Sequence, residues 1–335
     1  MTRTLRVGVV GAGAIAQVAH LPVLSKLKGV EVAAVCDNDL PKAQALASRF
    51  AVRDAFDDIE DLLGYAKPDA VVICTPNHLH EVHVIAALSA GVHVLCERPL
   101  ALSPAGVETI ISARQRAGRV VMVGMNHRFR SDVQAVLGFL RGGELGQLRA
   151  ARTGWYVFRP SRVGGPDWRR RRAESGGGAM FDLGLPLLDL ALWLGGNPEP
   201  GHVVSALNKS DSGVEESGGA LVVCKGGFSI FVDVSWSHVG DSERFWLDFM
   251  GDRGSAGIAP LRVFKEMHGT PMNVTPTGAA GRENAFTASY RAEWAHFLAS
   301  VRAEVDPPDL GEQLVLQRLL AAIYRSAEEG RDVTL

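Results

Sequence analysis

The first 124 residues alternate short, continuously apolar runs with amphipathic stretches, and this alternation constrains the fold more than any other feature of the chain. The runs are Leu5 to Val10, Val30 to Cys36, Ala70 to Cys74, Val92 to Cys96 and Val120 to Val123. Strands that are apolar at successive positions are typical of parallel sheets that helices cover on both faces. The pattern therefore predicts βαβ units and a parallel sheet over residues 1–124, which is an α/β fold.

A second sequence pattern begins after about residue 147, where longer segments alternate apolar and polar residues. With the Gly226-Gly227 pair as a hairpin turn, these segments are typical of an antiparallel sheet. Helical patterns follow at Ser289 to Val301 and Glu312 to Glu328, and the Gly-, Thr- and Pro-rich stretch His268 to Asn284 predicts a long loop. We expect a second, α+β domain over residues 125–335, with its C-terminal helix packing back on the first domain.

Charge and cysteine usage limit the partners and the compartment. The formal net charge of −2 offers no basic excess for nucleic-acid phosphates, so we expect no nucleic-acid partner. The four cysteines contain no CxxC pair and three of them lie in strand-like runs, which suits a reducing cytoplasm. The longest apolar candidate for a membrane span, Leu183 to Leu194, contains Pro186 and Asp189. We therefore predict a cytoplasmic protein that is not inserted in a membrane.

A glycine-rich segment follows the first apolar run and opens a helical stretch: Gly11-Ala12-Gly13-Ala14-Ile15-Ala16, a GxGxxA pattern. Glycines in such a turn let the backbone approach a pyrophosphate, which the unpaired N–H groups of the helix start then bind. An acid at the end of the second strand would accept hydrogen bonds from the adenosine ribose and repel a 2′-phosphate, which favours NAD over NADP. The alternative is a tight turn and a surface aspartate. The predicted nucleotide-binding residues are Gly11, Gly13, Ala14, Ile15 and Asp37.

The polar segment Thr75 to His80 follows the Ala70 to Cys74 run. Open α/β sheets bind their ligands at the carboxyl ends of the strands, where this loop is expected. His78, His80 and His83 suggest a metal cluster, but their spacing matches no helical HxxxH pair and no acidic partner is evident. We therefore predict no metal site and interpret them as histidines of a loop and a helix start.

Together these features resemble the Gfo/Idh/MocA family, the glucose-fructose oxidoreductase and inositol dehydrogenase group. The resemblance covers nearly the whole chain. It is carried by GAGAIA, Asp37, CTPNHLH, CERPLA, GMNHRF (Gly124 to Phe129), GELG (Gly143 to Gly146), DWR (Asp167 to Arg169) and GGGAMFDLGLPLLDLALWLGG (Gly176 to Gly196). It implies a doubly wound Rossmann domain and a second domain whose open, mostly antiparallel sheet mediates dimer or tetramer formation.

The resemblance also implies which side chains face the cofactor. Glu97 and Arg98 are expected beside the nicotinamide ring, and Pro99 is expected to fix the turn, with a cis bond as one option. The cofactor contacts implied in this way are Thr75, Pro76, Asn77, His80, Glu97, Arg98, Asn126, Trp168 and Arg169.

The chain departs from the family pattern where the proton chemistry is expected. Family members usually carry lysine where Arg98 stands, and a histidine where Pro186 stands, four residues after the aspartate that matches Asp182. Arginine stays protonated, so Arg98 can orient a substrate oxygen but cannot exchange its proton. Proline has no titratable side chain and is expected to break or kink the helix near Asp182. Losing a positioned acid or base typically costs about 10²- to 10⁴-fold in rate.

We therefore predict Arg98 and Asp182 as the catalytic residues, with His127 and Tyr156 as further candidates for proton transfer. The alternative for Asp182 is a helix N-terminal or capping carboxylate beside Gly178.

The run Arg169 to Arg172 is a further candidate for substrate recognition. Its arginines could pair with a carboxylate or phosphate of a ligand, although a solvated charged face is the more common use of such a run. The sequence thus predicts an NAD-dependent oxidoreductase that transfers hydride between the nicotinamide and a carbohydrate-like alcohol or ketone, with an anionic group as a weaker option. The rival hypothesis is a non-catalytic NAD-binding protein that binds or senses a sugar. A homodimer or homotetramer is expected in either case.

Overall fold

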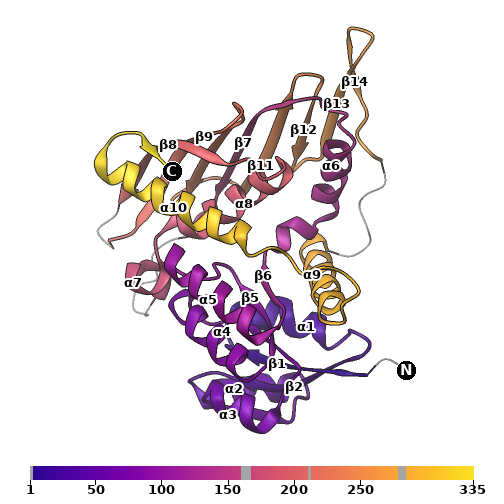
Figure 1. Ribbon diagram of the computed structural model, residues 1–335, viewed down its shortest axis with the longest axis vertical. Helices are drawn as coiled ribbons and strands as arrows, with labels where there is room; N and C mark the ends of the chain where they lie inside the picture. The colour runs from indigo at the N-terminus through magenta and orange to yellow at the C-terminus, as the bar shows by residue number, and fades with distance from the viewer. Residues whose placement is uncertain (1–2, 160–166, 210–212, 278–283) are drawn as a thin grey trace. The chain divides into compact units, whose positions relative to one another are not determined.

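The computed structural model describes residues 3–159, 167–209, 213–277 and 284–335. The chain divides into two compact units, each with its own sheet (Figure 1). Unit 1 comprises Met1–Asn126 and Phe286–Gln313, and unit 2 comprises His127–Ala285 and Leu314–Leu335.

Unit 1 is built on a six-stranded sheet in which every pair of neighbouring strands is parallel. The strands run in the order β3 (Asp54–Phe56), β2 (Val30–Cys36), β1 (Leu5–Val10), β4 (Ala70–Ile73), β5 (His93–Glu97) and β6 (Val121–Gly124). This order, 3-2-1-4-5-6, is that of the doubly wound dinucleotide-binding fold. The predicted α/β fold with a parallel sheet is confirmed. Strand β3 was not predicted, because three half-buried residues that begin with an aspartate carry no continuous apolar signal.

The helices described in unit 1 are α1 (Leu21–Leu24), α2 (Leu40–Arg49), α3 (Ile59–Asp61), α4 (His80–Ser89), α5 (Pro104–Ala117) and α9 (Ala285–Val301). Three of them, α2, α3 and α5, begin at residues whose side chains cap them. The side chain of Asp39 accepts a hydrogen bond from the Lys42 N–H, and that of Ser103 accepts one from Gly106. Helix α9 brings the fully buried Trp294 into unit 1, although almost 160 residues separate it from the parallel sheet.

Unit 2 is built on a nine-stranded sheet whose strands are mostly antiparallel, as predicted. Its order is β14 (Thr270–Asn273), β13 (Arg262–Met267), β12 (Gly254–Ile258), β11 (Arg244–Gly251), β7 (Leu148–Tyr156), β10 (Ser229–Ser235), β9 (Glu215–Cys224), β8 (Pro200–Lys209) and β15 (Val333–Thr334). The pair β7 and β10 is parallel. Gly226 and Gly227 have φ values of +86° and +88°, which only glycine adopts readily, so the predicted hairpin turn is confirmed.

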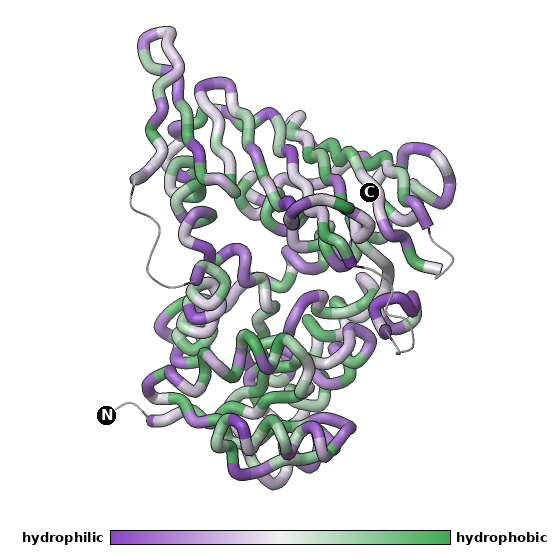
Figure 2. Tube along the Cα trace, turned by 180° about the vertical axis from the view of Figure 1, so that it is seen from behind, coloured by the Kyte–Doolittle hydropathy of each residue, from purple (hydrophilic) through white to green (hydrophobic). Residues whose placement is uncertain are grey.

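The predicted loop at His268 to Asn284 is wrong in its first part. Strand β14 pairs with β13 there and forms a hairpin that mixes hydrophobic and hydrophilic residues (Figure 2). All four residues of β14 are exposed, so backbone pairing rather than burial makes them a strand, and the sequence has no apolar pattern to reveal it. The rest of the prediction falls partly on residues 278–283, which lie outside the described residues.

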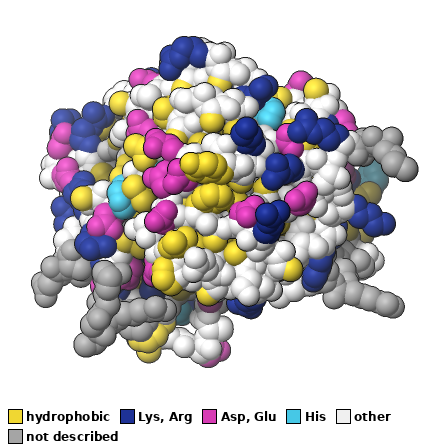
Figure 3. Space-filling model, turned by 90° about the horizontal axis from the view of Figure 1, so that it is seen from below, with side chains coloured by type: hydrophobic (Ala, Val, Ile, Leu, Met, Phe, Trp, Pro, Cys, Tyr) yellow, Lys and Arg dark blue, Asp and Glu magenta, His cyan; other side chains and the backbone are white. Residues whose placement is uncertain are grey.

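The helices of unit 2 are α6 (Ser131–Arg141), α7 (Arg172–Ser175), α8 (Leu185–Leu194) and α10 (Gly311–Glu329), the last beginning at the end of unit 1. Within the described chain, one helical stretch, Arg172–Leu194, is long and apolar enough to cross a membrane. However, 89% of its most apolar window is buried inside the structure, as in the core helix of a soluble protein. Figure 3 shows Lys and Arg side chains interspersed with Asp and Glu on the face that it presents, in line with the net charge of −2.

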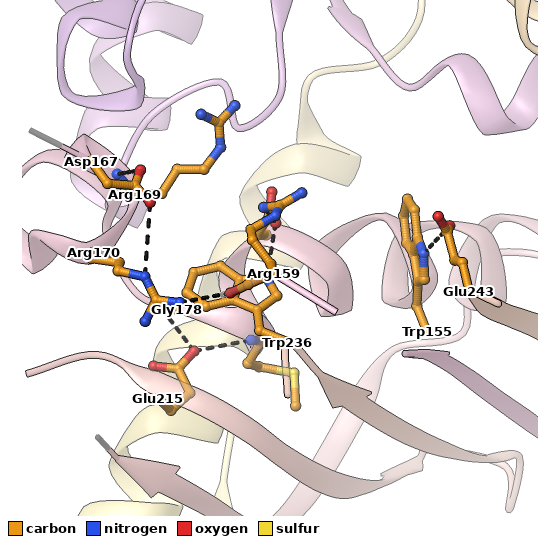
Figure 4. Close-up of polar contacts among 11 residues, drawn as sticks. Trp155, Arg159, Asp167, Arg169, Arg170, Gly178, Glu215, Trp236 and Glu243 are labelled. Carbon is orange, nitrogen blue, oxygen red and sulfur yellow. Dashed lines mark hydrogen bonds and ion pairs between the residues drawn. The ribbon is translucent and has the colours of Figure 1, made fainter. Parts of the chain in front are cut away.

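A buried carboxylate explains two of the three consecutive glycines before α8, Gly177 and Gly178. Glu215, on β9, accepts hydrogen bonds from the N–H groups of Gly178 (2.8 Å; Figure 4) and Met180 (3.0 Å). It also accepts one from the Tyr324 hydroxyl (2.6 Å). A Cβ atom at Gly178 would lie 1.9 Å from the Glu215 carbonyl oxygen, and one at Gly177 would lie 1.9 Å from the Tyr324 hydroxyl. Gly177 and Gly178 are therefore required by close packing, Gly176 has a φ of +87°, and Glu215 caps the helix that the three glycines open.

We expect Glu215→Ala to lower the free energy of unfolding by about 3 kcal/mol, because two buried N–H groups and a hydroxyl lose their acceptor. Tyr324→Phe keeps both N–H bonds and should cost about 1 kcal/mol. Denaturant unfolding of the two variants measures the difference, and equal losses would contradict the capping role.

Candidate functional site

The turn after β1 has a conformation and a packing that only glycine permits. Gly11 has a φ of +97°, and a Cβ atom on it would lie 2.7 Å from the carbonyl carbon and oxygen of Cys74, which follows β4. A Cβ atom on Gly13 would come no closer than 3.8 Å to the same oxygen. The helix starts at Ala14 and Ile15, continues through the π-helical turn Ala16–His20 and leads into α1. The turn thus combines an open backbone with the N-terminal end of a helix, which is a cradle for a pyrophosphate.

Asp37, directly after β2, holds this turn in place. Its Oδ2 accepts a hydrogen bond of 2.7 Å from the Ala12 N–H, and its Oδ1 accepts one of 3.2 Å from the Asp39 N–H. The Lys42 ammonium group lies 2.9 Å from Oδ2, with 43% of its side chain exposed. Exposed ion pairs contribute little stability. The lysine does, however, place a positive charge beside the acid that is predicted to repel a 2′-phosphate.

His80 links the loop after β4 to the loop after β5. Its imidazole is 1% exposed, with Nδ1 2.6 Å from the Pro99 carbonyl oxygen and Nε2 2.9 Å from that of Thr75. Burial lowers the pKa of His80, against the effect of both hydrogen bonds. The sequence assigned His80 to the cofactor. In the structure both ring nitrogens face backbone carbonyls, and direct contact with a cofactor stays a prediction.

The neighbouring histidines do not assemble into a metal site. His83 Nδ1 lies 3.1 Å from the Thr75 hydroxyl, and burial lowers the pKa of His83 to about 4. Among the residues that the structure describes, no three His, Cys, Asp or Glu side chains are grouped so that they could hold a metal ion.

Glu97, the last residue of β5, is the carboxylate of a buried hydrogen-bond chain. His20 Nε2 lies 2.8 Å from Glu97 Oε1, and the Trp294 indole N–H donates to His20 Nδ1 over 3.0 Å. Because an indole nitrogen can only donate, Nδ1 must accept, so the proton of the neutral imidazole is on Nε2 and points at Glu97. Burial opposes ionisation of Glu97, but the hydrogen bond and electrostatic interaction with His20, followed by the charge of Arg98, outweigh it and hold the pKa of Glu97 below its ordinary value.

Arg98 and Pro99 follow Glu97 with the cis peptide bond that was considered from the sequence. Asn126, two residues beyond β6, is buried and donates from its side-chain amide to the Ser289 hydroxyl on α9 (3.2 Å). Pro76 and Asn77 lie in the loop that joins β4 to α4. Within unit 1, the residues predicted from the sequence therefore lie at the carboxyl ends of β1, β2, β4, β5 and β6, which is the ligand-binding edge of such a sheet.

Asp182 is held by two donors within unit 2. It lies in the π-helical turn Met180–Gly184, and its Oδ2 accepts hydrogen bonds from the Arg159 guanidinium and from the Trp236 indole N–H (3.1 Å). Asp182 lies in the first turn of this helical segment, as the helix N-terminal alternative holds, but Glu215 rather than Asp182 accepts the hydrogen bonds from the Gly178 and Met180 N–H groups. Pro186 follows the π-helical turn Met180–Gly184, which already interrupts the regular α-helical hydrogen-bond pattern where proline lacks an N–H.

The two further candidates for proton transfer are engaged elsewhere in unit 2. The Tyr156 hydroxyl donates to Asp233 on the neighbouring strand over 2.5 Å, and burial together with this carboxylate raises the pKa of Tyr156 to about 12. The His127 ring packs against Trp155 and Phe245, with ring centroids 5.3 Å away in each case.

The arginine run is largely neutralised by acids. Arg170 is 8% exposed, donates to Glu216 (2.5 Å) and lies 3.8 Å from Asp167, while its guanidinium and that of Arg159 both lie over the Trp236 ring (Figure 4). The next two arginines pair with Glu174 and Glu328, and Arg169 stacks on Trp168 with 4.4 Å between its guanidinium carbon and the ring centroid. Because these arginines pair with acids of the protein itself, the arginine run is a weaker argument for an anionic substrate than it was in the sequence.

Models of known families match both parts of the chain. Residues 5–125 match an oxidoreductase family with an NAD-binding Rossmann fold, and residues 133–257 match the GFO/IDH/MocA C-terminal domain. The chain belongs to the GFO/IDH/MocA oxidoreductase family. The two matches establish the resemblance that was inferred from the motifs. The matched Rossmann fold, which contains the glycine turn, is NAD-binding.

Relatives of known activity are similar over most of the chain. The D-glucoside 3-dehydrogenase of Escherichia coli is 29% identical over 99% of this chain and 97% of its own length. The D-apiose dehydrogenase of Paraburkholderia graminis is 28% identical over 94% of this chain and 86% of its own. The crystal structure of GenD2 from gentamicin A biosynthesis, in complex with NAD, superposes with a TM-score of 0.85 at 26% identity and covers 100% of this chain and 97% of GenD2.

The residues of this family member fit an NAD dinucleotide. The glycine turn provides an open backbone at a helix start that could receive the pyrophosphate, and Asp37 places a carboxylate next to this turn, where the ribose is predicted to bind. Sequence reasoning missed the groups that hold other parts of the site, namely His20 and Trp294 behind Glu97, Arg159 at Asp182 and Glu215 at Gly178. Each of them is remote in sequence from the residue that it holds and belongs to no local motif.

We expect Asp37→Ala to reduce the preference for NADH over NADPH by about tenfold or more, because the repulsion of a 2′-phosphate is lost while Lys42 remains to attract it. Quenching of tryptophan emission by the two nucleotides measures their affinities. Lys42→Ala is the matched control and should sharpen the preference for NADH. An unchanged ratio in Asp37→Ala would show that Asp37 only holds the turn.

Proposed function

We propose that the protein is an NAD-dependent dehydrogenase or reductase of a carbohydrate-like alcohol or ketone. One observation carries this proposal. The glycine turn at Gly11 to Ile15 and the Glu97–Arg98 segment both lie at the carboxyl ends of the strands of the six-stranded parallel sheet. The names of the relatives, a glucoside dehydrogenase and an apiose dehydrogenase, support a sugar-like substrate. When bound, the nicotinamide supplies the site that accepts or gives the hydride.

The residues of the chain bind, orient and neutralise in this proposal. The turn at Gly11 to Ile15 and Asp37 bind the nucleotide, and Thr75, Pro76, Asn77 and Asn126 border it. Glu97 is fixed by His20 and keeps a negative charge next to Arg98. Trp168 and Arg169 would contribute from unit 2.

Arg98 and Asp182 are proposed as the catalytic pair. Arg98 keeps its proton and therefore orients and polarises the substrate oxygen. Asp182 is the candidate that moves the proton, and the two donors on its Oδ2 orient the carboxylate for that task. A base held by an arginine is weaker than a free one, so we expect slower proton transfer than a histidine in place of Pro186 would give.

We expect Arg98→Ala and Asp182→Asn each to lower kcat/KM by about 10²-fold or more, because one removes a charged donor and the other a titratable acceptor. Turnover of a panel of glycosides and free sugars, followed as NADH absorbance, identifies the substrate and measures the loss. Glu60→Gln, an exposed substitution, is the control. Unchanged turnover in both site variants would refute the catalytic assignment. Tight NADH binding without hydride exchange to any sugar would favour the rival, non-catalytic sugar-binding or sensing protein.

We also propose a cytoplasmic homodimer or homotetramer that associates through the open face of the nine-stranded sheet. Exposed apolar side chains gather on this face, including Val204 (46% exposed) and Phe231 (40%). With Tyr156, Asp233 and Trp246 they line a broad concavity of about 1130 Å³. A face of this kind is typical of a protein–protein contact.

We expect Phe231→Glu to convert the oligomer to a monomer, because a charge on the contact face would be buried without a partner. Sedimentation velocity measures the mass, and Val239→Glu, at an 85% exposed position, is a comparison at the rim. A monomeric wild-type protein would refute the proposal.

A further inference from the structure

Glu293 is a fully buried carboxyl group that no part of the proposed mechanism uses. It lies on α9 with 0% of its surface exposed. Within the described part of the chain, neither of its carboxyl oxygens has a hydrogen-bond partner. An ionised carboxylate without a partner in an apolar interior costs many kcal/mol, and such a group takes up a proton instead.

The groups around Glu293 supply no compensating positive charge. The negative charge of Glu97 and burial both raise the pKa of Glu293 far above its ordinary value, and burial is the larger cause. Cys74, which follows β4, and Tyr290, on α9, interact electrostatically with both Glu97 and Glu293. The cation Arg98, which follows β5, acts on Glu97 and Tyr290.

His20 cannot serve as the missing cation. Its Nδ1 accepts the Trp294 hydrogen bond and its Nε2 proton points at Glu97, so both ring nitrogens are used by the neutral imidazole. A second proton on His20 would direct an N–H group against the indole N–H of Trp294. The hydrogen-bond chain therefore stabilises a negative charge on Glu97 and leaves Glu293 to be neutral.

We propose that Glu97 and Glu293 form a carboxyl pair that holds one proton at neutral pH, with the charge on Glu97 and the proton on Glu293. Glu293 is then a positioning residue, which keeps this edge of unit 1 at a single negative charge. Where the proposed NAD-dependent function holds, that single charge favours the cationic oxidised nicotinamide over the neutral reduced form.

The proton on Glu293 has a consequence that needs no cofactor. Between the unfolded-state pKa, near 4.3, and the raised folded-state pKa, the folded protein binds one proton more than the unfolded chain, so its stability falls as pH rises. The unfolding equilibrium shifts about tenfold per pH unit in this window. We expect Glu293→Gln to lack this dependence. Between pH 5 and pH 7 the unfolding equilibrium constant of the wild type should therefore rise about 100-fold relative to that of Glu293→Gln.

Denaturant unfolding of the wild-type protein, Glu293→Gln and the exposed control Glu60→Gln at several pH values tests this expectation. The control should follow the wild type. A difference between Glu293→Gln and the wild type that stays constant with pH would overturn the proposal. Infrared spectra of the cofactor-free wild type give an independent answer, because a protonated carboxyl has a carbonyl-stretch band that a carboxylate lacks. The band should persist at neutral pH and in Glu97→Gln, and its absence from the wild type would overturn the proposal even if Glu293→Gln fails to fold.

Nucleotide titrations separate this inference from the proposed function. Glu97→Gln should weaken NAD⁺ relative to NADH several-fold, whereas Glu293→Gln should leave the ratio of the two dissociation constants near the wild-type value. An equal shift in both variants would mean that Glu293 is ionised and would overturn the inference. If neither nucleotide binds the wild type, the proposed function fails, while the unfolding and infrared measurements still decide where the proton is.

Discussion

The hydrogen bond between His20 and Glu97 is the interaction on which the ligand edge of unit 1 depends. It joins three segments that are far apart in sequence: the helix that follows the glycine turn, the end of β5 and, through Trp294, helix α9. The indole N–H donates to His20 Nδ1, and the His20 Nε2–H donates to the Glu97 carboxylate. The hydrogen bonds of His20 orient Glu97 and leave His20 unable to pair with Glu293. In our proposal this one imidazole therefore determines which of the two carboxyl groups carries the charge.

The parallel sheet and the nucleotide turn could be predicted from the sequence because both are local patterns. Continuous apolar runs indicate strands covered on two faces, and the spacing of Gly11, Gly13 and Asp37 places them at one edge. The groups that orient the site could not be predicted in this way. His20 and Trp294 meet across 274 positions, and Arg159 reaches Asp182 across 23, so only the folded chain brings them together. Strand β14 was missed for a different reason, since backbone pairing leaves no mark on exposed side chains.

The departures at Arg98 and Pro186 alter the chemistry more than the architecture. Proline follows the π-helical turn Met180–Gly184, and the start of this helix at Gly178 is secured by Glu215 rather than by any residue of the motif itself. Gly177 and Gly178 belong to that capping arrangement, with Tyr324 and Glu215 packed where their side chains would otherwise be. The motif is therefore retained for packing even where its proton-transfer residue has been replaced.

The two margins of the nine-stranded sheet are closed in different ways. One margin is β15, which has only two residues, and the other is β14, which carries Pro271 and so lacks one of the N–H groups that a further strand would need. Neither margin is a good template for lengthening the sheet with a strand from another molecule. A sheet of nine strands can therefore form in one chain without edge strands that favour edge-to-edge aggregation, which is a risk of long open sheets.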